Sequence, residues 1–473
     1  MEEQNITKKS DAALREERVL EFWKENKIFE KSLKQSEGKK EFVFYDGPVT
    51  ANSKPVLHTM VPFSFKDAIP RYKTMRGFHV RRKGGWDTHG LPVELQIEKK
   101  LGLNSKKEIE EYGIAKFNND CKESVWEYVE FWKIFTKRVG YWADQENAYV
   151  TYHNEYIESV WNIVKKINQQ KLLYKDYKVV PWCPRCGTAL SSHELAQGYE
   201  DVKDLSVYVK FKVKGKENTY ILAWTTTPWT LPCNVALTVG EDIDYVEIKT
   251  PARNASGIAD ADGGEEILIF AKDRLPIITE PYKIIASHKG KEIVGMQYEP
   301  LFPYLKEQLE KKVESTEKMF KVYPASFVNT GDGTGIVHTA VMYGQDDFVL
   351  GTEVGLPKHH LVNPEGKFVS SLGGTGFLEG RSVKEKDTNN KPTLDVDIIK
   401  YLTDKNLFFK KENYEHSYPH CWRCQTALIY YARDSWYIKM SDPKIKKRLI
   451  NENQKINWEP AHIRNGRFGE WLR

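Results

Sequence analysis

The octet Cys183-Pro-Arg-Cys-Gly-Thr-Ala-Leu190 occurs a second time, with two changes, as Cys421-Trp-Arg-Cys-Gln-Thr-Ala-Leu428. Two Cys-x-x-Cys pairs can supply four thiolates to one tetrahedral zinc ion, and a closed all-thiolate set is typical of a structural site. Redox dithiols use the same spacing, but the repeated flanking residues favour zinc, with four ligands: Cys183, Cys186, Cys421 and Cys424. We call the two octets the knuckles. The long stretch between them predicts that the chain leaves one domain, builds a second and returns to the first.

The bulk composition describes a multidomain globular protein. A chain of 473 residues is too long for one hydrophobic core and predicts two or three domains. Its hydrophobic content of 40% excludes a disordered protein. The net charge of +5 arises from 71 basic and 66 acidic residues, a balance that permits a nucleic-acid partner without requiring one.

Cysteine usage and apolar runs bear on the cellular compartment. Beyond the four knuckle cysteines only Cys121 and Cys233 remain, which favours a reducing compartment over a disulfide scaffold. The polar N-terminus resembles no secretory signal, and the sequence has no run of 18 apolar residues. We therefore expect a cytoplasmic protein without a membrane partner.

The first part of the chain has the pattern of an α/β domain. Glu41–Tyr45 is a short apolar and aromatic run that predicts a strand, and a helix is expected over Met60–Met75 with a kink at Pro70. A strand, a loop and a helix in this order begin a βα unit, in which the carboxyl end of the strand faces a ligand crevice. Periodic apolar residues predict further helices over residues 11–29, 108–139 and 155–171.

From about Asp201 the sequence becomes rich in strand-forming residues. Four strands are expected over residues 205–213, 220–224, 267–270 and 284–286. Polar and glycine-rich segments predict an exposed loop over residues 253–266 and a hinge over residues 384–393. The interval between the knuckles thus predicts a compact, β-dominated inserted domain with few helices, after which helical character returns.

Three polar strings are candidates for chemistry. Gly85–Glu94 (GWDTHGLPVE) places a carboxylate beside a histidine and could hold an α-ammonium group, although an ordinary capped turn has the same composition. Trp224–Asn234 carries four threonines and an amide; threonines suit a strand, but two prolines favour an irregular segment whose hydroxyls line a pocket. Gly333–His338 leads to Asp346 and Asp347, which could bind an amine or simply begin a helix.

These strings occur in one order along the chain. Tyr45–Pro48, Lys66–Gly77, the Gly85–Glu94 string, the threonine-rich string and both knuckles together closely resemble the isoleucyl-tRNA synthetases, a class I aminoacyl-tRNA synthetase family. The resemblance covers nearly the whole chain. It implies an incomplete, doubly wound, Rossmann-like α/β catalytic domain, interrupted by a β-rich editing domain on a zinc-knuckle neck.

The resemblance also implies domain boundaries. They are residues 1–40 for an N-terminal helical extension, 41–180 for the first part of the catalytic domain, 181–204 for the neck, 205–395 for the editing domain, 396–430 for the returning neck with the second knuckle, and 431–473 for the resumed, truncated catalytic domain.

Roles for single residues follow from the resemblance as well. In the synthetic site Pro48 would line the isoleucine pocket, Asp87 would hold the substrate ammonium and His89 would support that wall. In the editing site six residues would surround a misacylated tRNA end: Thr226, Thr227, Thr230, Asn234, His338 and Asp347. The implied partners are isoleucine, ATP with Mg²⁺, and tRNA(Ile), with hydrolysis by a positioned water and with zinc in a structural role only.

The sequence departs from the family pattern in three places. The family's His-x-Gly-His signature is replaced, and we expect His58 and Thr59 to donate to phosphate oxygens instead. Val341 and Tyr343 stand where the family has other residues, while Asp347 is kept. The Lys-Met-Ser-Lys-Ser signature does not occur; Lys439–Asp442 comes too early and predicts a strand edge running into a helix cap at Ser441 or Asp442.

Three functions remain open from the sequence. The first is the N-terminal portion of an isoleucine–tRNA ligase that edits valyl-tRNA. Such a portion is expected not to aminoacylate alone, and a separate C-terminal half is a candidate partner. One missing methylene is worth roughly 1–3 kcal/mol, an effect for which this family is the standard example, so a second hydrolytic pocket is needed. The second is a stand-alone trans-editing deacylase. The third is a non-catalytic, synthetase-like tRNA-binding module.

Overall fold

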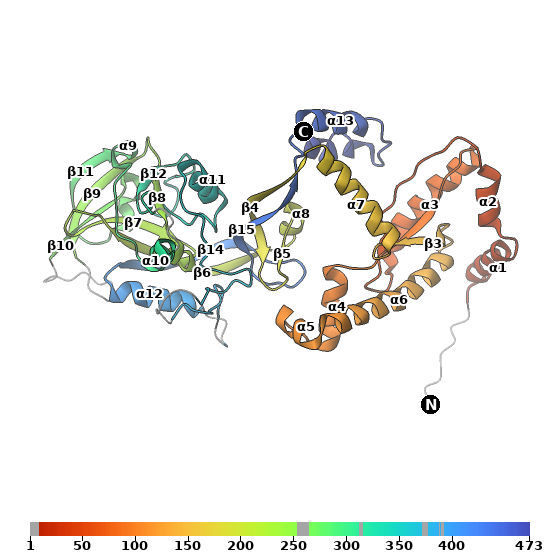
Figure 1. The fold of residues 1–473 in the computed structure, drawn as a ribbon, viewed down its shortest axis with the longest axis horizontal. Helices are drawn as coiled ribbons and strands as arrows, with labels where there is room; N and C mark the ends of the chain where they lie inside the picture. Colours follow the sequence, from red (N-terminus) through yellow and green to blue (C-terminus); the bar gives the residue numbers. More distant parts are fainter. Residues whose placement is uncertain (1–8, 253–263, 312–315, 371–376, 387, 389–391) are drawn as a thin grey trace. The chain divides into compact units, whose positions relative to one another are not determined.

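The computed structural model describes residues 9–252, 264–311, 316–370, 377–386, 388 and 392–473. The chain forms two compact units, which we call unit 1 (Met1–Leu173 and Ile438–Arg473) and unit 2 (Tyr174–Tyr437) (Figure 1). An α/β unit is thus interrupted by a β-rich one, as predicted. None of the helices in the described part of the chain is long and apolar enough to cross a membrane.

Unit 1 is mainly helical around a small parallel sheet. The sheet has the order β1-β2-β3, with both pairs parallel. Its elements are α1 (Asp11–Glu25), α2 (Ile28–Ser36), β1 (Val49–Thr50), η1 (Leu57–Thr59), α3 (Met60–Met75), β2 (Lys83–Asp87), α4 (Leu91–Leu101), α5 (Lys106–Tyr112), α6 (Ile114–Arg138), β3 (Asp144–Val150), α7 (Asn154–Gln169), α13 (Pro443–Asn453), η4 (Ala461–Ile463) and α14 (Arg467–Leu472).

The core of unit 1 lies between this sheet and the helices that follow its strands. Phe63 of α3, Trp86 of β2 and Trp132 of α6 are buried together with valines of α4 and α6. Pleated strands place alternate side chains on one face, and the spacing of apolar residues in α6 presents one stripe to them. The carboxyl ends of the three strands are thereby held by one core.

The predicted strand at Glu41–Tyr45 is wrong. Only Glu41 pairs there, in a single bridge with His79 that is closed by the bond from Phe42 N–H to His79 O at 2.9 Å. Regular pairing begins at Val49, opposite Trp86. The two registers differ by one residue, so a continuous ladder cannot join them, and the intervening segment leaves the sheet.

Two predicted helices are each divided by a residue with a left-handed or otherwise positive φ. The helix expected over residues 11–29 ends at Glu25, because Lys27 has a φ of 47°. The helix expected over residues 108–139 is split into α5 and α6 at Gly113, whose φ is 105°. α3 has its predicted bounds, and Asp442 caps α13 by accepting hydrogen bonds from the N–H groups of Lys444 and Ile445.

Unit 2 is built on one curled sheet of nine strands. Its main path is β11-β9-β10-β7-β13-β8-β12, with β6 on β7 and β14 on β6. The nine strands of this sheet in the described residues are β6 (Tyr199–Lys212), β7 (Thr219–Thr225), β8 (Ala236–Val239), β9 (Asp244–Pro251), β10 (Glu265–Ala271), β11 (Lys283–Lys289), β12 (Val322–Pro324), β13 (Ile336–Thr339) and β14 (Phe408–Pro419). A separate sheet contains β4 (Leu173–Cys183), β5 (Thr188–Ala189) and β15 (Ile429–Ile438).

The helices of unit 2 are short. They are α8 (Ser192–Leu195), η2 (Pro228–Cys233), η3 (Lys272–Ile277), α9 (Gly290–Ile293), α10 (Tyr304–Lys311), α11 (Gln345–Val354) and α12 (Leu394–Asp404). The four predicted strands are confirmed as β6, β7, β10 and β11. Residues 253–263 of the predicted loop lie outside the described residues, and the prediction is wrong at Glu265 and Glu266, which begin β10. Part of the predicted hinge, residues 387 and 389–391, also lies outside them.

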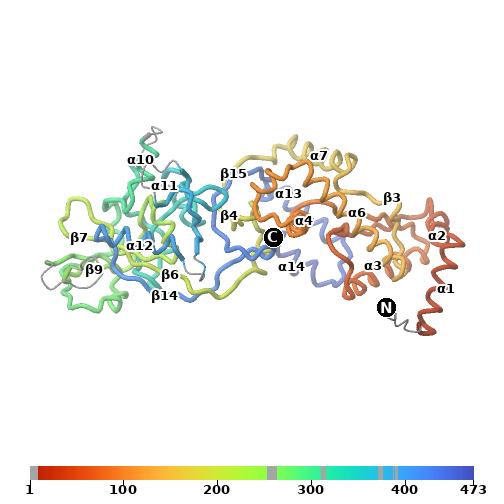
Figure 2. Tube along the Cα trace, turned by 90° about the horizontal axis from the view of Figure 1, so that it is seen from below, coloured from red at the N-terminus to blue at the C-terminus, as the bar shows by residue number. Residues whose placement is uncertain are grey.

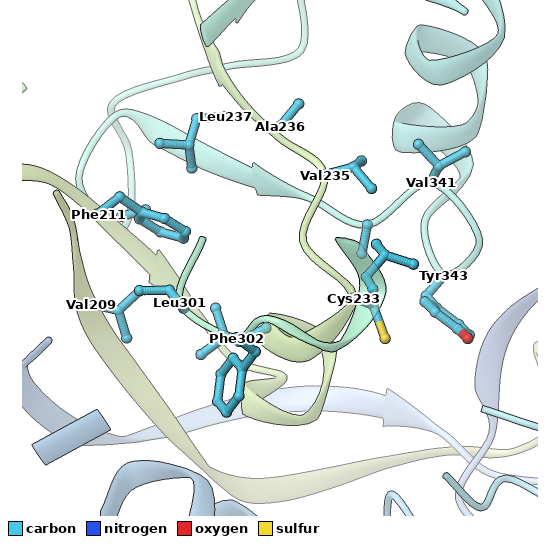
Figure 3. Packing of buried hydrophobic residues seen from close by; sticks show 14 of the residues in the cluster. Val209, Phe211, Cys233, Val235, Ala236, Leu237, Leu301, Phe302, Val341 and Tyr343 are labelled. Carbon is cyan, nitrogen blue, oxygen red and sulfur yellow. The ribbon is translucent and has the colours of Figure 1, made fainter. Parts of the chain in front are cut away.

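A large apolar core fills unit 2 and surrounds the η2 turn. Figure 3 shows part of it, with Cys233 next to Tyr343, and every residue of η2 is buried. The other face of the sheet, which carries a second apolar cluster with Tyr208 of β6 and Leu268 of β10, holds a buried ion pair: Lys210 Nζ of β6 lies 2.8 Å from Glu266 Oε2 of β10, with side-chain exposures of 0% and 2%. Such a pair is stable only because each charge has the other.

The chain enters and leaves unit 2 along neighbouring strands. β4 lies between β5 and β15 in a separate three-stranded sheet. The rings of Tyr174 and Tyr437 lie 5.9 Å apart, and Lys175 Nζ is 2.8 Å from Asp434 Oδ2. Beyond the knuckles the antiparallel pair β6 and β14 runs side by side into the main sheet (Figure 2).

Candidate functional site

The four knuckle cysteines come together as the sequence predicted. Their sulfur atoms all lie within 4.8 Å of one another, and Cys424 Sγ is 3.5 Å from Cys183 Sγ and 3.4 Å from Cys186 Sγ. A tetrahedral zinc ion with bonds of about 2.3 Å needs sulfur atoms about 3.8 Å apart. The donor set therefore fits zinc.

The two knuckles have the same backbone conformation. Leu190 N–H donates to Pro181 O, and Leu428 N–H donates to Pro419 O in the second copy. The residue after the second cysteine has positive φ in both, 62° at Gly187 and 59° at Gln425. Glycine adopts this left-handed conformation without steric cost. Glutamine adopts it at some cost, which the surrounding turn offsets.

A buried network connects the threonine-rich string with β13. Thr230 Oγ1 lies 2.8 Å from His338 Nε2, and the Thr230 hydroxyl donates to Thr227 O at 2.8 Å. Asn234 Nδ2 donates to Ala236 O at 2.8 Å and lies 3.3 Å from His338 Nδ1. The prolines of η2 turn the chain away from the β7 ladder, as predicted, and place these groups opposite β13.

The hydrogen bonds around His338 suit one neutral tautomer. When the Thr230 hydroxyl donates to Thr227 O, Thr230 Oγ1 is placed to accept from a His338 Nε2–H. Nδ1 then accepts from the Asn234 amide, which gives a neutral imidazole with both ring nitrogens engaged. Complete burial lowers the pKa of His338 to about 4, in agreement with this neutral form. Because the ring has no free lone pair, His338 is placed to orient hydroxyls and not to act as a general base.

Asp347 lies at the start of α11 and turns back toward β13. Its Oδ2 accepts the Ala340 N–H at 2.8 Å, two residues beyond His338. Burial raises the pKa of Asp347 to about 6, and the neighbouring Asp346 acts in the same direction. Asp346 is exposed, so the two carboxylates of this acidic pair have different environments.

The structure brings most of the predicted editing residues together and adds two. Thr227, Thr230, Asn234 and His338 form one network, whereas Thr226 is half-buried and makes no side-chain hydrogen bond with a described residue. Two residues that the sequence reasoning missed belong to it. Thr225 Oγ1 lies 3.2 Å from Thr227 Oγ1, and the Tyr298 hydroxyl donates to Asn234 Oδ1 at 2.7 Å. The threonine run itself pointed to Thr225, but nothing in the sequence pointed to Tyr298.

In unit 1 polar residues gather at the carboxyl ends of the parallel strands. Asp87 Oδ2, at the end of β2, accepts from the Thr50 hydroxyl at the end of β1 at 3.0 Å. His89 Nδ1 lies 3.3 Å from Thr151 Oγ1, just after β3. This edge is where open α/β sheets bind ligands. Pro48 directly precedes β1 and therefore lies at its amino end, whereas Thr50 lies at its carboxyl end.

A cavity of about 530 Å³ opens where the segment before β1 leaves the sheet. Asp46, Gly47, Trp86 and Tyr149 are among the residues that line it. None of the three predicted isoleucine-binding residues lines this cavity: Pro48, Asp87 and His89. His58 is exposed on the η1 turn and Thr59 is half-buried where η1 continues into α3, so both lie at a helix start, a position that suits phosphate.

Sequence comparison gives consistent relatives. Isoleucine–tRNA ligase of Clostridium tetani is 49% identical over 458 residues, which are 97% of this chain and 41% of that protein. The isoleucine–tRNA ligase of Bacillus thuringiensis strain Al Hakam is 45% identical over 465 residues, 98% of this chain and 42% of that protein. The chain thus spans about two fifths of the length of the curated relatives it matches.

Solved structures give a weaker likeness. A LeuRS in a ternary complex with tRNA, from Agrobacterium radiobacter K84, covers 89% of this chain and 49% of its own at 16% identity and a TM-score of 0.33. The editing domain of the P. knowlesi cytosolic leucyl-tRNA synthetase covers 46% of this chain and 99% of its own, at 15% identity and a TM-score of 0.27. Neither of these structural similarities enters the family assignment.

The family model decides the assignment. The model described as "tRNA synthetases class I (I, L, M and V)" matches residues 18–473, which is nearly the whole chain and includes both knuckles. The protein therefore belongs to the class I tRNA synthetases of the isoleucine, leucine, methionine and valine group.

Proposed function

We propose that the chain is part of an isoleucine–tRNA ligase and that unit 2 hydrolyses valyl-tRNA formed in error. The observation that carries the hydrolytic site is the network of Thr227, Thr230, Asn234 and His338 beside a carboxylate at Asp347. Identity of 45–49% to isoleucine–tRNA ligases supports the choice of amino acid.

The structure supports distinct roles for these groups. The neutral His338 holds the Thr230 hydroxyl, and the half-buried Thr226 and Thr227 present further hydroxyls that can orient a water or the terminal ribose. Asp347 supplies the negative charge that an α-ammonium group requires. Catalysis in this proposal is by positioning and hydrogen bonding, with the water as nucleophile.

Within unit 2, the proposed editing domain comprises residues 205–395, and the proposed neck comprises residues 181–204 and 396–430. The neck would hold a zinc ion on Cys183, Cys186, Cys421 and Cys424, which fit it in number, distance and chemistry. Zinc there supplies structure alone, since all four positions are filled by thiolates. The cysteine usage, with four cysteines in the cluster and Cys121 and Cys233 apart from it, supports a reducing, cytoplasmic compartment.

The ligase reaction is proposed for the longer enzyme to which such a chain corresponds. Isoleucine would be held near Pro48, Asp87 and His89, and ATP with Mg²⁺ would meet His58 and Thr59, before transfer to tRNA(Ile). Thr50 and Thr151 hold Asp87 and His89 in place. Isoleucine-dependent pyrophosphate exchange by a full-length version, lost on His58→Ala with Thr59→Val, tests the phosphate role.

Removing the Asp347 carboxylate is expected to lower deacylation of valyl-tRNA(Ile). Asp347→Ala should reduce kcat/KM about 10- to 100-fold, since a hydrogen bond to a charged group contributes about 1.5–3 kcal/mol. Release of labelled valine from valyl-tRNA(Ile) by the purified chain measures it. Asp346→Ala is the matched control, because it removes an equal charge from the same helix turn and should leave the rate within about twofold. Equal losses in both variants would contradict the role of Asp347, and an inactive wild-type chain would contradict the editing proposal.

The same carboxylate predicts a pH dependence. The pKa of Asp347 is raised to about 6 by burial, so the ammonium-binding anion is lost as the pH falls through about 6. kcat/KM reports groups of the free enzyme and should fall about tenfold per pH unit below that point. A pH profile of deacylation from pH 5 to 8 measures this. Asp347→Asn keeps an acceptor for Ala340 N–H but cannot ionise, so its profile should lack the inflection.

A further inference from the structure

Gly344, directly before α11, does not need the conformational freedom of glycine. Its φ of −142° and ψ of 140° are those of extended backbone, which any residue adopts. Alanine or valine would fit this backbone as well. The reason for a glycine must therefore lie in the space around its α-carbon.

That space is occupied by the Asp347 carboxylate. A Cβ atom at residue 344 would lie 2.7 Å from Asp347 Oδ2, 2.8 Å from Cγ and 3.3 Å from Cβ. Contacts under 3 Å are not tolerated, and the nearest atoms belong to a side chain that can rotate. The added methyl group would thus move the carboxylate without forcing the backbone apart.

We infer that Gly344 is a positioning residue for Asp347: its missing Cβ lets the carboxylate fold back over the start of α11. In this orientation Asp347 Oδ2 reaches the N–H of Ala340, which follows the end of β13. The bond fastens α11 to the strand that carries His338. This inference rests on the proposed editing function. It gives Gly344 a role in that function although Gly344 does not itself contact the substrate.

A second glycine of the same helix provides a matched comparison. A Cβ at Gly351 would lie 2.5 Å from Cγ2, 2.8 Å from Cγ1 and 3.3 Å from Cβ of Val341, so its three nearest neighbours all belong to that valine. Gly351→Ala therefore disturbs packing under α11, whereas Gly344→Ala disturbs the carboxylate. Both variants replace glycine by alanine, so general effects of the added methyl group appear in both.

The test is a double-mutant cycle on deacylation of valyl-tRNA(Ile) by the full chain. Gly344→Ala should lower kcat/KM at least about tenfold in the wild-type background and less than about twofold in the Asp347→Ala background, since the displaced group is then already absent. Any effect of Gly351→Ala should persist in both backgrounds. Equal effects of Gly344→Ala in both backgrounds, or no effect in the wild type, would overturn the inference.

A second measurement does not depend on deacylation. In a chain labelled with ¹³C at the aspartate carboxyl carbons, Asp347→Asn identifies the Asp347 resonance. The pKa obtained from this resonance should fall from about 6 in the wild type toward that of a solvated aspartate in Gly344→Ala. The reason is that the displaced carboxylate becomes more exposed to water. An unchanged titration would overturn the inference even if the chain deacylates. A shifted titration in a chain that does not deacylate would support the positioning role and contradict the proposed function alone.

Discussion

Lys210→Met is expected to lower the free energy of unfolding of unit 2 by about 3–5 kcal/mol. The Lys210 ammonium lies 2.8 Å from Glu266 Oε2, and both side chains are buried between β6 and β10. The same ammonium lies 3.5 Å from Asn406 Oδ1 and 5.0 Å from the Tyr220 ring. Methionine fills the volume but leaves the Glu266 carboxylate buried without its counter-charge.

The measurement is hydrogen exchange at increasing guanidinium concentration. It reports the free energy of unfolding of β6 and β10 separately from that of unit 1. The double variant Lys210→Met with Glu266→Leu is the control, because replacing both charges by apolar groups removes the unpaired ion and is often neutral or stabilising. Recovery of most of the lost stability is expected. A single variant within about 1 kcal/mol of the wild type would contradict the role given to the pair.

Loss of zinc is the second large effect expected. The purified chain should contain one zinc ion per molecule. Cys424→Ser should abolish zinc binding, because the site would keep only three thiolates. Apparent binding free energies of structural zinc reach roughly 10–16 kcal/mol in small zinc domains. We expect a fall of several kcal/mol in the stability of the β4, β5 and β15 sheet, while β7 to β13 keep their own core.

Metal content by mass spectrometry and hydrogen exchange of residues 174–200 measure this effect. Cys121→Ser is the control, because Cys121 lies in the core of unit 1 and outside the cluster. It should leave the zinc content unchanged. A wild-type chain that binds no added zinc, or Cys424→Ser with full zinc content, would contradict the proposed site.

Local patterns in the sequence predicted much of the fold. The repeated octets identified four cysteines that meet although the chain between them is long, because each knuckle is a closed local turn. β6, β7, β10 and β11 follow from runs of strand-forming residues, and the turn at η2 follows from its prolines. Composition drew attention to the strings that carry Thr230 and His338, and the resemblance to the isoleucyl-tRNA synthetases singled out these two residues within them.

Features that depend on distant partners could not be predicted. Tyr298 stands between Gln297 and Glu299 in the sequence, and only the fold shows that its hydroxyl donates to Asn234 Oδ1. Lys210 has the pattern of a solvent-facing strand residue, and its burial depends on β10. The strand expected at Glu41–Tyr45 does not form for the same reason, since the segment pairs at Glu41 alone, with His79, which precedes β2.

The adjacency of Tyr174 and Tyr437 has an evolutionary consequence. A module whose entry and exit strands lie side by side can be spliced into a surface loop of a host, which need not stretch to accommodate it. The host then bears little of the entropic cost of closing so long an excursion, because the neck closes it independently. A module inserted in this way can change its sequence and its site without redesign of the domain that received it.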